Sequence, residues 1–256
     1  MKIATWNVNS LRVRLDHVRD WLGRTTPDVL GLQETKLTDD KFPVADFAEI
    51  GYQCAFSGQP TYNGVALISR EPATEIATDL EAYEDPQRRV LAATVSGVRV
   101  LNLYVPNGQS VESEKYVYKL GWLAALRAQL RDDLKRYEHV VVMGDFNVAP
   151  ADQDVHDPAA WAGKILCSAK ERASLDAIVD LGLSDTFRLF DQPERCFSWW
   201  DYRAAGFRRN LGLRIDLILA SAALKEACTS CTIDKEPRRL ERPSDHAPVI
   251  AEFHAL

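Results

Sequence analysis

Several features that would indicate other classes of protein are missing from this sequence. No apolar run approaches the ~20 residues that span a bilayer. The first residues, Met1–Trp6, are short and mixed in character, unlike the apolar stretch of a signal peptide. We therefore expect a cytoplasmic protein.

Cysteine is scarce, with five in 256 residues. An odd number in a long chain fits a reduced compartment better than a disulfide framework. Cys228 and Cys231 form the one CxxC pair, and no second pair or neighbouring histidine accompanies it. Because a structural zinc ion needs four ligands, we interpret the pair as partly buried thiols beside a strand.

Positive charge is not in excess either, since the formal net charge is −6. Proteins that coat nucleic acids neutralise phosphates with lysine and arginine, so the charge argues against that class. An enzyme of phosphate esters is still possible, because an acidic metal-binding pocket can lie inside a basic rim. Positive residues do cluster, at Arg12/Arg14, Arg88–Arg89, Lys115/Lys119, Arg208–Arg209 and Arg238–Arg239/Arg242.

Long linkers are also absent, because no stretch rich in Gly, Ser or Pro divides the chain. We therefore expect a single domain over 1–256. Apolar residues make up 46% of the chain, which is enough for a large core. Their periodicity predicts strands at 2–6, 29–33, 65–69, 91–95, 98–104, 139–144, 197–200, 213–221 and 249–253, and helices near 12–23, 113–136 and 171–181. This order favours an α/β protein in which two sheets stack between helices.

Polar residues lie where the predicted strands end. Asn7 and Asn9, Glu34, Asn107, Asp145 and Asn147 all follow strands, and Asp245 and His246 precede the last one. Each of them taken alone could be a turn or cap residue. Asp216 is harder to explain in that way, because it lies in the apolar stretch 215–219 and an unpaired buried carboxylate is costly. His246 would be a natural partner for it.

Taken together, these side chains resemble the ligands that bind a hard cation. The candidate ligands are Asn7, Glu34, Asp145, Asn147, Asp245 and His246. Oxygen donors with few nitrogens and no thiolate suit Mg²⁺, which keeps several waters and is completed by substrate phosphate. Zinc would require more histidine or cysteine. We therefore predict a Mg²⁺ site in which Mn²⁺ is able to substitute.

The same residues belong to motifs that resemble, in order, those of the exonuclease III family of AP endonucleases. This family lies within the DNase I-like endonuclease/exonuclease/phosphatase superfamily. The motifs span the chain: TWNVN (5–9), LQETK (32–36), NGVA (63–66), YVPNG (104–108), GDFN (144–147), FSW (197–199), GLRID (212–216) and SDHAP (244–248). The resemblance implies a four-layer α/β sandwich, with two stacked and mainly antiparallel sheets flanked by helices. It also implies Mg²⁺ or Mn²⁺ dependence and a monomer that hydrolyses DNA phosphodiesters at abasic sites, nicks or recessed 3′ ends of duplex DNA.

The resemblance also implies roles for individual residues. Glu34 would be the principal metal ligand, and Asp145 would orient and deprotonate the attacking water. His246, held by Asp216, would contact the scissile phosphate, and Tyr104 would lie beside it or beside the leaving oxygen. The remaining members near the metal or the phosphate would be Asn7, Asn107, Asn147 and Asp245.

Substrate contacts are implied in the same way. Trp199 and Leu213 match positions that wall an apolar pocket for a base-free sugar or a terminal nucleotide. For Trp199, which has Trp200 beside it, plain core packing is a competing interpretation. Lys36, Lys115 and Lys119 are predicted phosphate contacts.

One stretch departs from the family pattern. The segment 164–168, KILCS, has bulky residues where many members of the family carry a smaller stretch that contains glycine. Such residues could crowd an abasic nucleotide. The sequence therefore favours trimming of 3′ ends, by removal of a 3′ phosphate or a 3′ nucleotide, over incision at abasic sites.

Two other readings remain open at this stage. Phosphodiesterases of inositol phosphates or sphingomyelin share the Glu, Asp-x-Asn and Asp-His groups, although the 32–36 motif and the predicted Trp199 pocket favour DNA. A non-catalytic member of the superfamily would have gaps among the metal-facing residues, and we see none.

Overall fold

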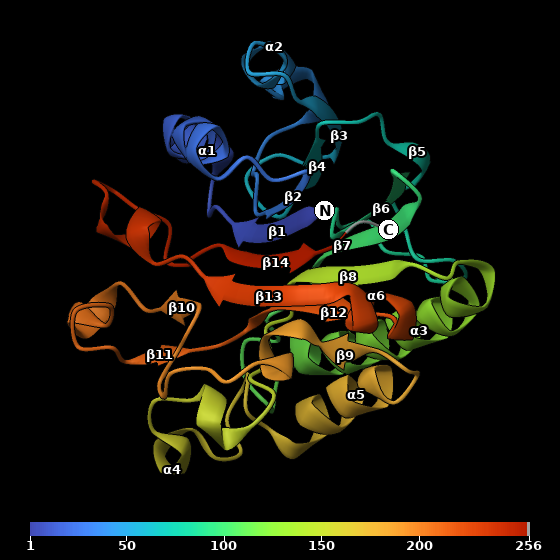
Figure 1. The fold of residues 1–256 in the computed structure, drawn as a ribbon. Coiled ribbons are helices and arrows are strands. Elements are labelled where there is room, and N and C mark those ends of the chain that lie inside the picture. The colour runs from blue at the N-terminus through green and yellow to red at the C-terminus, as the bar shows by residue number, and fades with distance from the viewer. Residues whose placement is uncertain (255–256) are drawn as a thin grey trace.

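The computed structural model describes residues 1–254, in which two six-stranded sheets pack against each other (Figure 1). The first sheet has the order β13-β14-β1-β2-β4-β3. Its strands are β1 (Lys2–Asn7), β2 (Val29–Gln33), β3 (Gln53–Ser57), β4 (Val65–Ser69), β13 (Cys228–Ile233) and β14 (Val249–Phe253). β1 and β2 are parallel and the other pairs are antiparallel.

The second sheet has the order β5-β6-β7-β8-β12-β9. Its strands are β5 (Thr74–Ala77), β6 (Val90–Val95), β7 (Val98–Tyr104), β8 (Val140–Asp145), β9 (Ser184–Asp185) and β12 (Asp216–Ala220). Only β7 and β8 are parallel among its described pairs. A small ribbon of β10 (Trp199–Trp200) and β11 (Gly212–Leu213) stands apart from both sheets.

Helices cover the outer face of each sheet, as Figure 1 shows. These are α1 (Leu11–Thr25) and α2 (Val44–Ala48) on the first sheet, and α3 (Glu114–Arg136) and α5 (Ala169–Val179) on the second. The short α6 (Ala222–Ala227) instead contributes Leu224 and Ala227 to the core between the sheets, and Trp161 of α4 (Pro158–Trp161) packs against a separate cluster. α1 and α2 pack on the first sheet through an apolar cluster that includes Trp21 and Phe47. α3 and α5 pack on the second sheet through a cluster that includes Trp122 and Leu175. The predicted four-layer α/β sandwich is confirmed.

The central core lies between the two sheets. It joins residues of the first sheet, such as Val29 and Leu67, to residues of the second, such as Val141 and Ile218. These strands are buried on both faces, which explains why β2, β4 and β8 read as continuous apolar runs instead of alternating ones.

A buried polar bridge fixes the two sheets against each other close to the ends of β1 and β2. Asn102 on β7 donates to the carbonyls of Leu32 and Ala66, both at 2.9 Å, and accepts from Gln33 at 2.6 Å. A Cβ on Gly31 would lie 2.7 Å from Asn102 Oδ1, so only glycine allows this close approach. Because both N–H donors and the oxygen of the Asn102 amide have partners on the opposite sheet, the bridge specifies how the strand ends meet.

The sequence predicts the buried elements better than the exposed ones. The strands at 29–33, 65–69 and 98–104 and the helix at 113–136 agree with the structure to within one residue. The strands β3, β5 and β13 were not predicted; β5 is exposed throughout, so no apolar pattern indicates it.

The predicted strand at 213–221 is wrong in one respect. β11 ends at Leu213, and β12 begins only at Asp216. Arg214 breaks the ladder because its backbone N–H donates to the Asp154 carbonyl and its guanidinium pairs with Asp154 and Asp185. At Arg214 the chain therefore leaves the sheet and takes part in this buried ionic network.

Two further expectations concern thiols and membranes. Cys228 and Cys231 are free, and the Cys231 thiol is buried beside Thr186. Burial raises the pKa of both thiols, so they stay protonated at neutral pH and are poor metal ligands.

Over the range 1–254, the helices are all too short or too polar to cross a membrane.

Candidate active site

Strand topology brings distant residues to one edge of the sandwich. β1 and β2 are parallel, so Asn7 at the end of β1 and Glu34 just after β2 emerge on the same side. β12 runs antiparallel to β8, which pairs its first residue, Asp216, with the last residue of β8, Asp145. The loop before β14 adds His246. Five positions up to 239 residues apart in the chain thus share one site.

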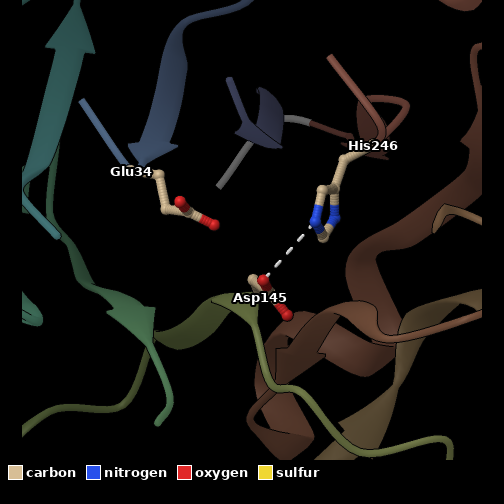
Figure 2. Close-up of side chains that lie close together, drawn as sticks. All are labelled: Glu34, Asp145 and His246. Carbon is tan, nitrogen blue, oxygen red and sulfur yellow. Dashed lines mark ion pairs between the residues drawn. The ribbon is translucent and has the colours of Figure 1, made fainter. Parts of the chain in front are cut away.

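Figure 2 shows Glu34, Asp145 and His246 facing one another. One ligand atom from each lies within 4.8 Å of the others. Asn7 Nδ2 donates to Glu34 Oε1 and to Asp145 Oδ2, both at 2.9 Å, and so holds the two carboxylates at a fixed separation. Lys36 Nζ lies 3.0 Å from Glu34 Oε2. The convergence predicted from the sequence is therefore present.

Unusual backbone conformations present these side chains. Glu34 has φ of 50° and Asn147 has φ of 49°, both in the left-handed region that non-glycine residues avoid. Gly144, just before Asp145, has φ of 145°, and a Cβ there would lie 1.9 Å from the Leu103 carbonyl oxygen. Such conformations persist where the surrounding structure imposes them, and they concentrate at functional sites.

His246 is buried between two carboxylates. Its Nδ1 lies 2.9 Å from Asp216 Oδ2, and its Nε2 lies 3.7 Å from Asp145 Oδ2. Burial alone would lower the pKa of the imidazole, but the charges of Asp216 and Asp145 outweigh it and raise the pKa to about 10. The predicted pairing of His246 with Asp216 is therefore found. An imidazolium is a hydrogen-bond donor, so this environment favours its predicted contact with phosphate over its predicted role as a metal ligand.

Ser198 is a member of this constellation that the sequence reasoning did not assign. Its Oγ donates to Asp216 Oδ2 at 2.7 Å and accepts from the backbone N–H groups of Ile215 and Asp216. It holds the carboxylate that orients His246. The FSW motif at 197–199 was the available signal, but only its tryptophan was singled out.

The electrostatics of Asp145 favour a bound cation. Burial raises the pKa of Asp145 to about 7, with His246 opposing the shift and the charges of Asp216 and Glu34 adding to it. A divalent ion between Asp145 and Glu34 would stabilise both ionised carboxylates. The donors are mainly oxygens, as Mg²⁺ prefers. Asn7, however, turns its NH₂ group to the carboxylates while its Oδ1 accepts from the Asn9 N–H, so its role as a ligand stays a prediction.

Asn147, Asn107 and Tyr104 line the same site. Asn147 N–H donates to Asp145 Oδ1 at 2.9 Å, and Asn107 Nδ2 donates to Asn147 Oδ1 at 3.2 Å. Burial and the charges of Glu34 and Asp145 raise the pKa of Tyr104 well above its usual value, so the phenol keeps its proton. The guanidinium of Arg89, which was not predicted here, lies 4.8 Å from the Tyr104 ring centroid and holds the ring in place.

Asp245 is near the cluster but is already engaged by neighbours. Its Oδ1 accepts from Asn9 Nδ2 at 3.0 Å and its Oδ2 accepts from Trp199 Nε1 at 2.9 Å. Lys36 Nζ in turn donates to Asn9 Oδ1 at 2.6 Å. A chain of hydrogen bonds thus runs from Lys36 to Trp199, and metal ligation by Asp245 stays a prediction.

The two residues predicted to wall an apolar pocket pack together with Leu166. Leu166 has only 4% of its surface exposed and belongs to one apolar cluster with Leu213, against which Trp199 packs. Its φ of 70° is unusual for a leucine. Leu166, from the bulky 164–168 segment, thus lies beside both predicted pocket residues, and crowding of an abasic nucleotide by this segment stays a prediction.

The three lysines predicted to contact phosphate differ in how exposed their side chains are. Lys36 is half-buried beside Glu34, and Lys115 is exposed and lines a cavity of about 680 Å³ that also reaches Tyr104 and Asn107. The prediction for Lys119 is wrong. Its side chain is fully buried in an ion pair with Glu171, where no DNA phosphate can reach it.

Comparison with known proteins agrees with this geometry. A model described as the Endonuclease/Exonuclease/phosphatase family matches residues 4–246. Exodeoxyribonuclease III of Haemophilus influenzae is 36% identical, over 99% of this chain and 100% of the relative. A 3′ phosphatase, NExo from Neisseria, solved with a product DNA hairpin, is 51% identical with a TM-score of 0.98 over 100% of both chains. An AP endonuclease from Archaeoglobus fulgidus is 42% identical with a TM-score of 0.96, again over 100% of both chains.

Proposed function

We propose, from the premise that this chain belongs to the endonuclease/exonuclease/phosphatase family, that it is a metal-dependent DNA repair nuclease acting on 3′ ends. The observation that carries the proposal is the convergence of Glu34, Asp145 and His246 within 4.8 Å at the edge of the sandwich. DNA as the substrate is supported by the relatives, which include an exodeoxyribonuclease and a 3′ phosphatase solved with DNA.

Side chains of the protein itself carry out most steps in the proposed hydrolysis of a phosphate ester. The Asp145 carboxylate accepts a proton from the water whose oxygen attacks phosphorus, and Asn147 N–H keeps that carboxylate in position. The His246 imidazolium, oriented by Asp216, donates to a phosphoryl oxygen as negative charge develops there. The bond from phosphorus to the DNA O3′ then breaks, and the leaving oxygen takes up a proton from the surrounding water. Tyr104, which lines one cavity with Asn107 and keeps its phenol proton, would lie beside the phosphate or the leaving oxygen.

We propose Mg²⁺ as the cation, held by Glu34 and Asp145 with Asn7 orienting both carboxylates. The metal would supply charge neutralisation at the phosphoryl group and at the leaving oxygen. Asp245 and Asn147 are further candidate ligands, and Mn²⁺ suits the same oxygen donors.

Metal binding should be measurable without any substrate. Addition of Mg²⁺ to EDTA-treated protein should raise the melting temperature by several degrees, because an ion that binds only the folded state stabilises it by about 2.7 kcal/mol at a hundred times its Kd. Differential scanning fluorimetry of the EDTA-treated protein across a MgCl₂ titration tests this. A Glu34→Gln variant should show little of the shift. An equal shift in that variant would place the ion elsewhere.

The proposed preference for 3′ ends rests on the packing of Leu166 beside Trp199 and Leu213. In hydrolysis at an internal abasic site, a sugar continues beyond the scissile phosphate and needs space near Trp199 and Leu213. Leu166 is packed in that apolar cluster. A terminal 3′ phosphate has nothing beyond the phosphorus, so it requires no such pocket. We therefore propose that removal of 3′ phosphates is favoured over incision at abasic sites.

A side-by-side assay tests this preference. One duplex carries a 3′ phosphate at a nick, and the other carries an internal tetrahydrofuran, a stable analogue of an abasic site. We expect the first to be processed at least about a hundredfold faster, the cost that misplacing reacting atoms by about 1 Å can impose. Comparable rates on the two duplexes would refute the preference while leaving the nuclease assignment intact.

The alternative functions have less support. A non-catalytic relative would lack part of the metal-facing cluster, yet its carboxylates and histidine come together here. An enzyme of inositol phosphates or lipids would have a similar cluster, but the relatives compared above are nucleases or phosphatases of DNA by name. Failure to release phosphate from nicked DNA, together with release from inositol phosphates, would favour this alternative.

A further inference from the structure

Lys119 is a fully buried lysine on the apolar face of α3. Tyr116, Trp122 and Leu123 are buried on the same face of the helix. Burial lowers the pKa of Lys119, with the charge of Glu171 opposing the shift. Apolar side chains at such a position are often as stabilising as a buried ion pair, so stability alone gives little reason for a lysine here.

The ammonium group of Lys119 has partners on three different segments. It donates to the backbone carbonyl of Asn147 at 2.6 Å, to the carbonyl of Asn107 at 3.1 Å, and to Glu171 Oε1. A lysine has three N–H donors, and these contacts use all of them. Two of the contacts hold the backbone of residues whose side chains line the candidate active site.

Glu171 extends this connection to the segment beside the apolar pocket. Its Oε1 also accepts from the Leu166 N–H at 3.0 Å, and its Oε2 accepts from the Ser168 N–H and from Ser168 Oγ. Ser168 and Glu171 form the capping box at the start of α5. Glu171 therefore holds Leu166 in position through its backbone.

We propose that the Lys119–Glu171 pair is a positioning element that fixes the loops of Asn107 and Asn147 relative to the Leu166 segment, and thereby sets both turnover and the choice of substrate. This inference rests on the proposed function. Lys119 touches no reacting atom. It acts through Asn147, whose backbone N–H holds Asp145 and whose side chain accepts from Asn107. Loss of the shared anchor frees both sides of the site at once.

The test compares Lys119→Met, Glu171→Gln and the double variant with the wild-type protein. The single Lys119→Met change leaves a buried carboxylate unpaired and should lower the melting temperature. The double variant removes both charges and keeps a residue at position 171 that can complete a capping box, so its melting temperature should recover. Lys170→Met is the matched control, because Lys170 is exposed on α5 next to Glu171.

Kinetics separate positioning from stability. For removal of a 3′ phosphate at a nick, we expect kcat of the double variant to fall about tenfold to a hundredfold while KM changes little, since misplacement by about 1 Å costs up to a hundredfold. Incision at an internal tetrahydrofuran should fall less or rise, because the Leu166 segment is looser. Lys170→Met should match the wild type. A double variant with recovered melting temperature and wild-type kcat overturns the proposal.

Hydrogen exchange supplies a measurement that does not depend on activity. Mass spectrometry should show faster amide exchange in the double variant at all three segments, 105–108, 145–149 and 164–168. Faster exchange confined to 164–168 would mean that Glu171 acts only as a helix cap, and the proposal fails. If the wild-type protein releases no phosphate from nicked DNA, the proposed function fails, and the exchange result alone decides whether the anchor exists.

Discussion

Asp145→Asn is expected to reduce turnover on nicked DNA with a 3′ phosphate by about 10²–10⁴-fold, the usual contribution of a general base. Asparagine has the same shape as aspartate but cannot accept the proton of the attacking water. It also removes one of the two negative charges that face each other across Asn7, which weakens any bound cation. Its carbonyl can still accept from Asn147 N–H, so the loop should keep its conformation.

The measurement is the single-turnover rate at saturating enzyme and Mg²⁺, together with the melting temperature of each protein. Asp176→Asn provides the matched control, because Asp176 is exposed on α5 and its side chain makes no hydrogen bond or ion pair with the described residues. This control should keep the wild-type rate. A rate within tenfold of wild type for Asp145→Asn would mean that another group activates the water, and the assignment of Asp145 would be withdrawn.

Leu166→Gly is expected to give the opposite kind of change, a gain of activity. Removing the side chain opens space beside Leu213 and Trp199 for the sugar of an abasic nucleotide. Glycine adopts the φ of 70° at this position without strain. Incision at an internal tetrahydrofuran should rise by about a hundredfold, because the variant no longer misplaces the reacting atoms of this substrate. Removal of a 3′ phosphate should change by less than about threefold, because that substrate needs no space beside Leu213 and Trp199.

The gain must be separated from general loosening of the protein. Loss of a buried leucine costs about 2–5 kcal/mol, so the variant should melt at a lower temperature. Leu183→Ala is the control, because Leu183 has the same 4% exposure and lies in the cluster under α3 and α5, away from the pocket. Destabilisation without new incision is expected there. If the Leu166→Gly protein likewise shows no new incision at the internal site, the Leu166 side chain does not determine which substrate is preferred.

The candidate site was largely predictable because its residues are polar groups at places where polarity is costly or unusual. Asp216 in an apolar strand required a partner, and His246 supplies one. Glu34 follows the buried β2, whose parallel pairing with β1 brings it to the same edge as Asn7, and Asp145 ends the buried β8, where it pairs with Asp216. Ser198 was marked only by its place in the FSW motif, because a serine beside a strand has no local pattern that shows it will hold a carboxylate.

Other assignments needed the packing. Lys36, Lys115 and Lys119 look alike as sequence, since each is a lysine near a predicted phosphate site. The helix period could have raised doubt, because Lys119 lies three residues from Tyr116 and from Trp122 on the buried face of α3. Its partner Glu171 is 52 residues away, however, so only the packing of α3 against the start of α5 brings the pair together.

The sequence by itself determined the α/β class, because apolar periodicity is a local property of the chain, and its ordered motifs implied the four-layer fold, the family and the residues of the candidate cation site. The tertiary structure alone decided that Lys119 is buried, that Leu166 packs in one apolar cluster with Leu213 and Trp199, and that Asp245 is shared between Asn9 and Trp199. These depend on contacts between segments far apart in the chain, and the free energy of such a contact depends on the distance, burial and charge of both partners. No single segment carries that information.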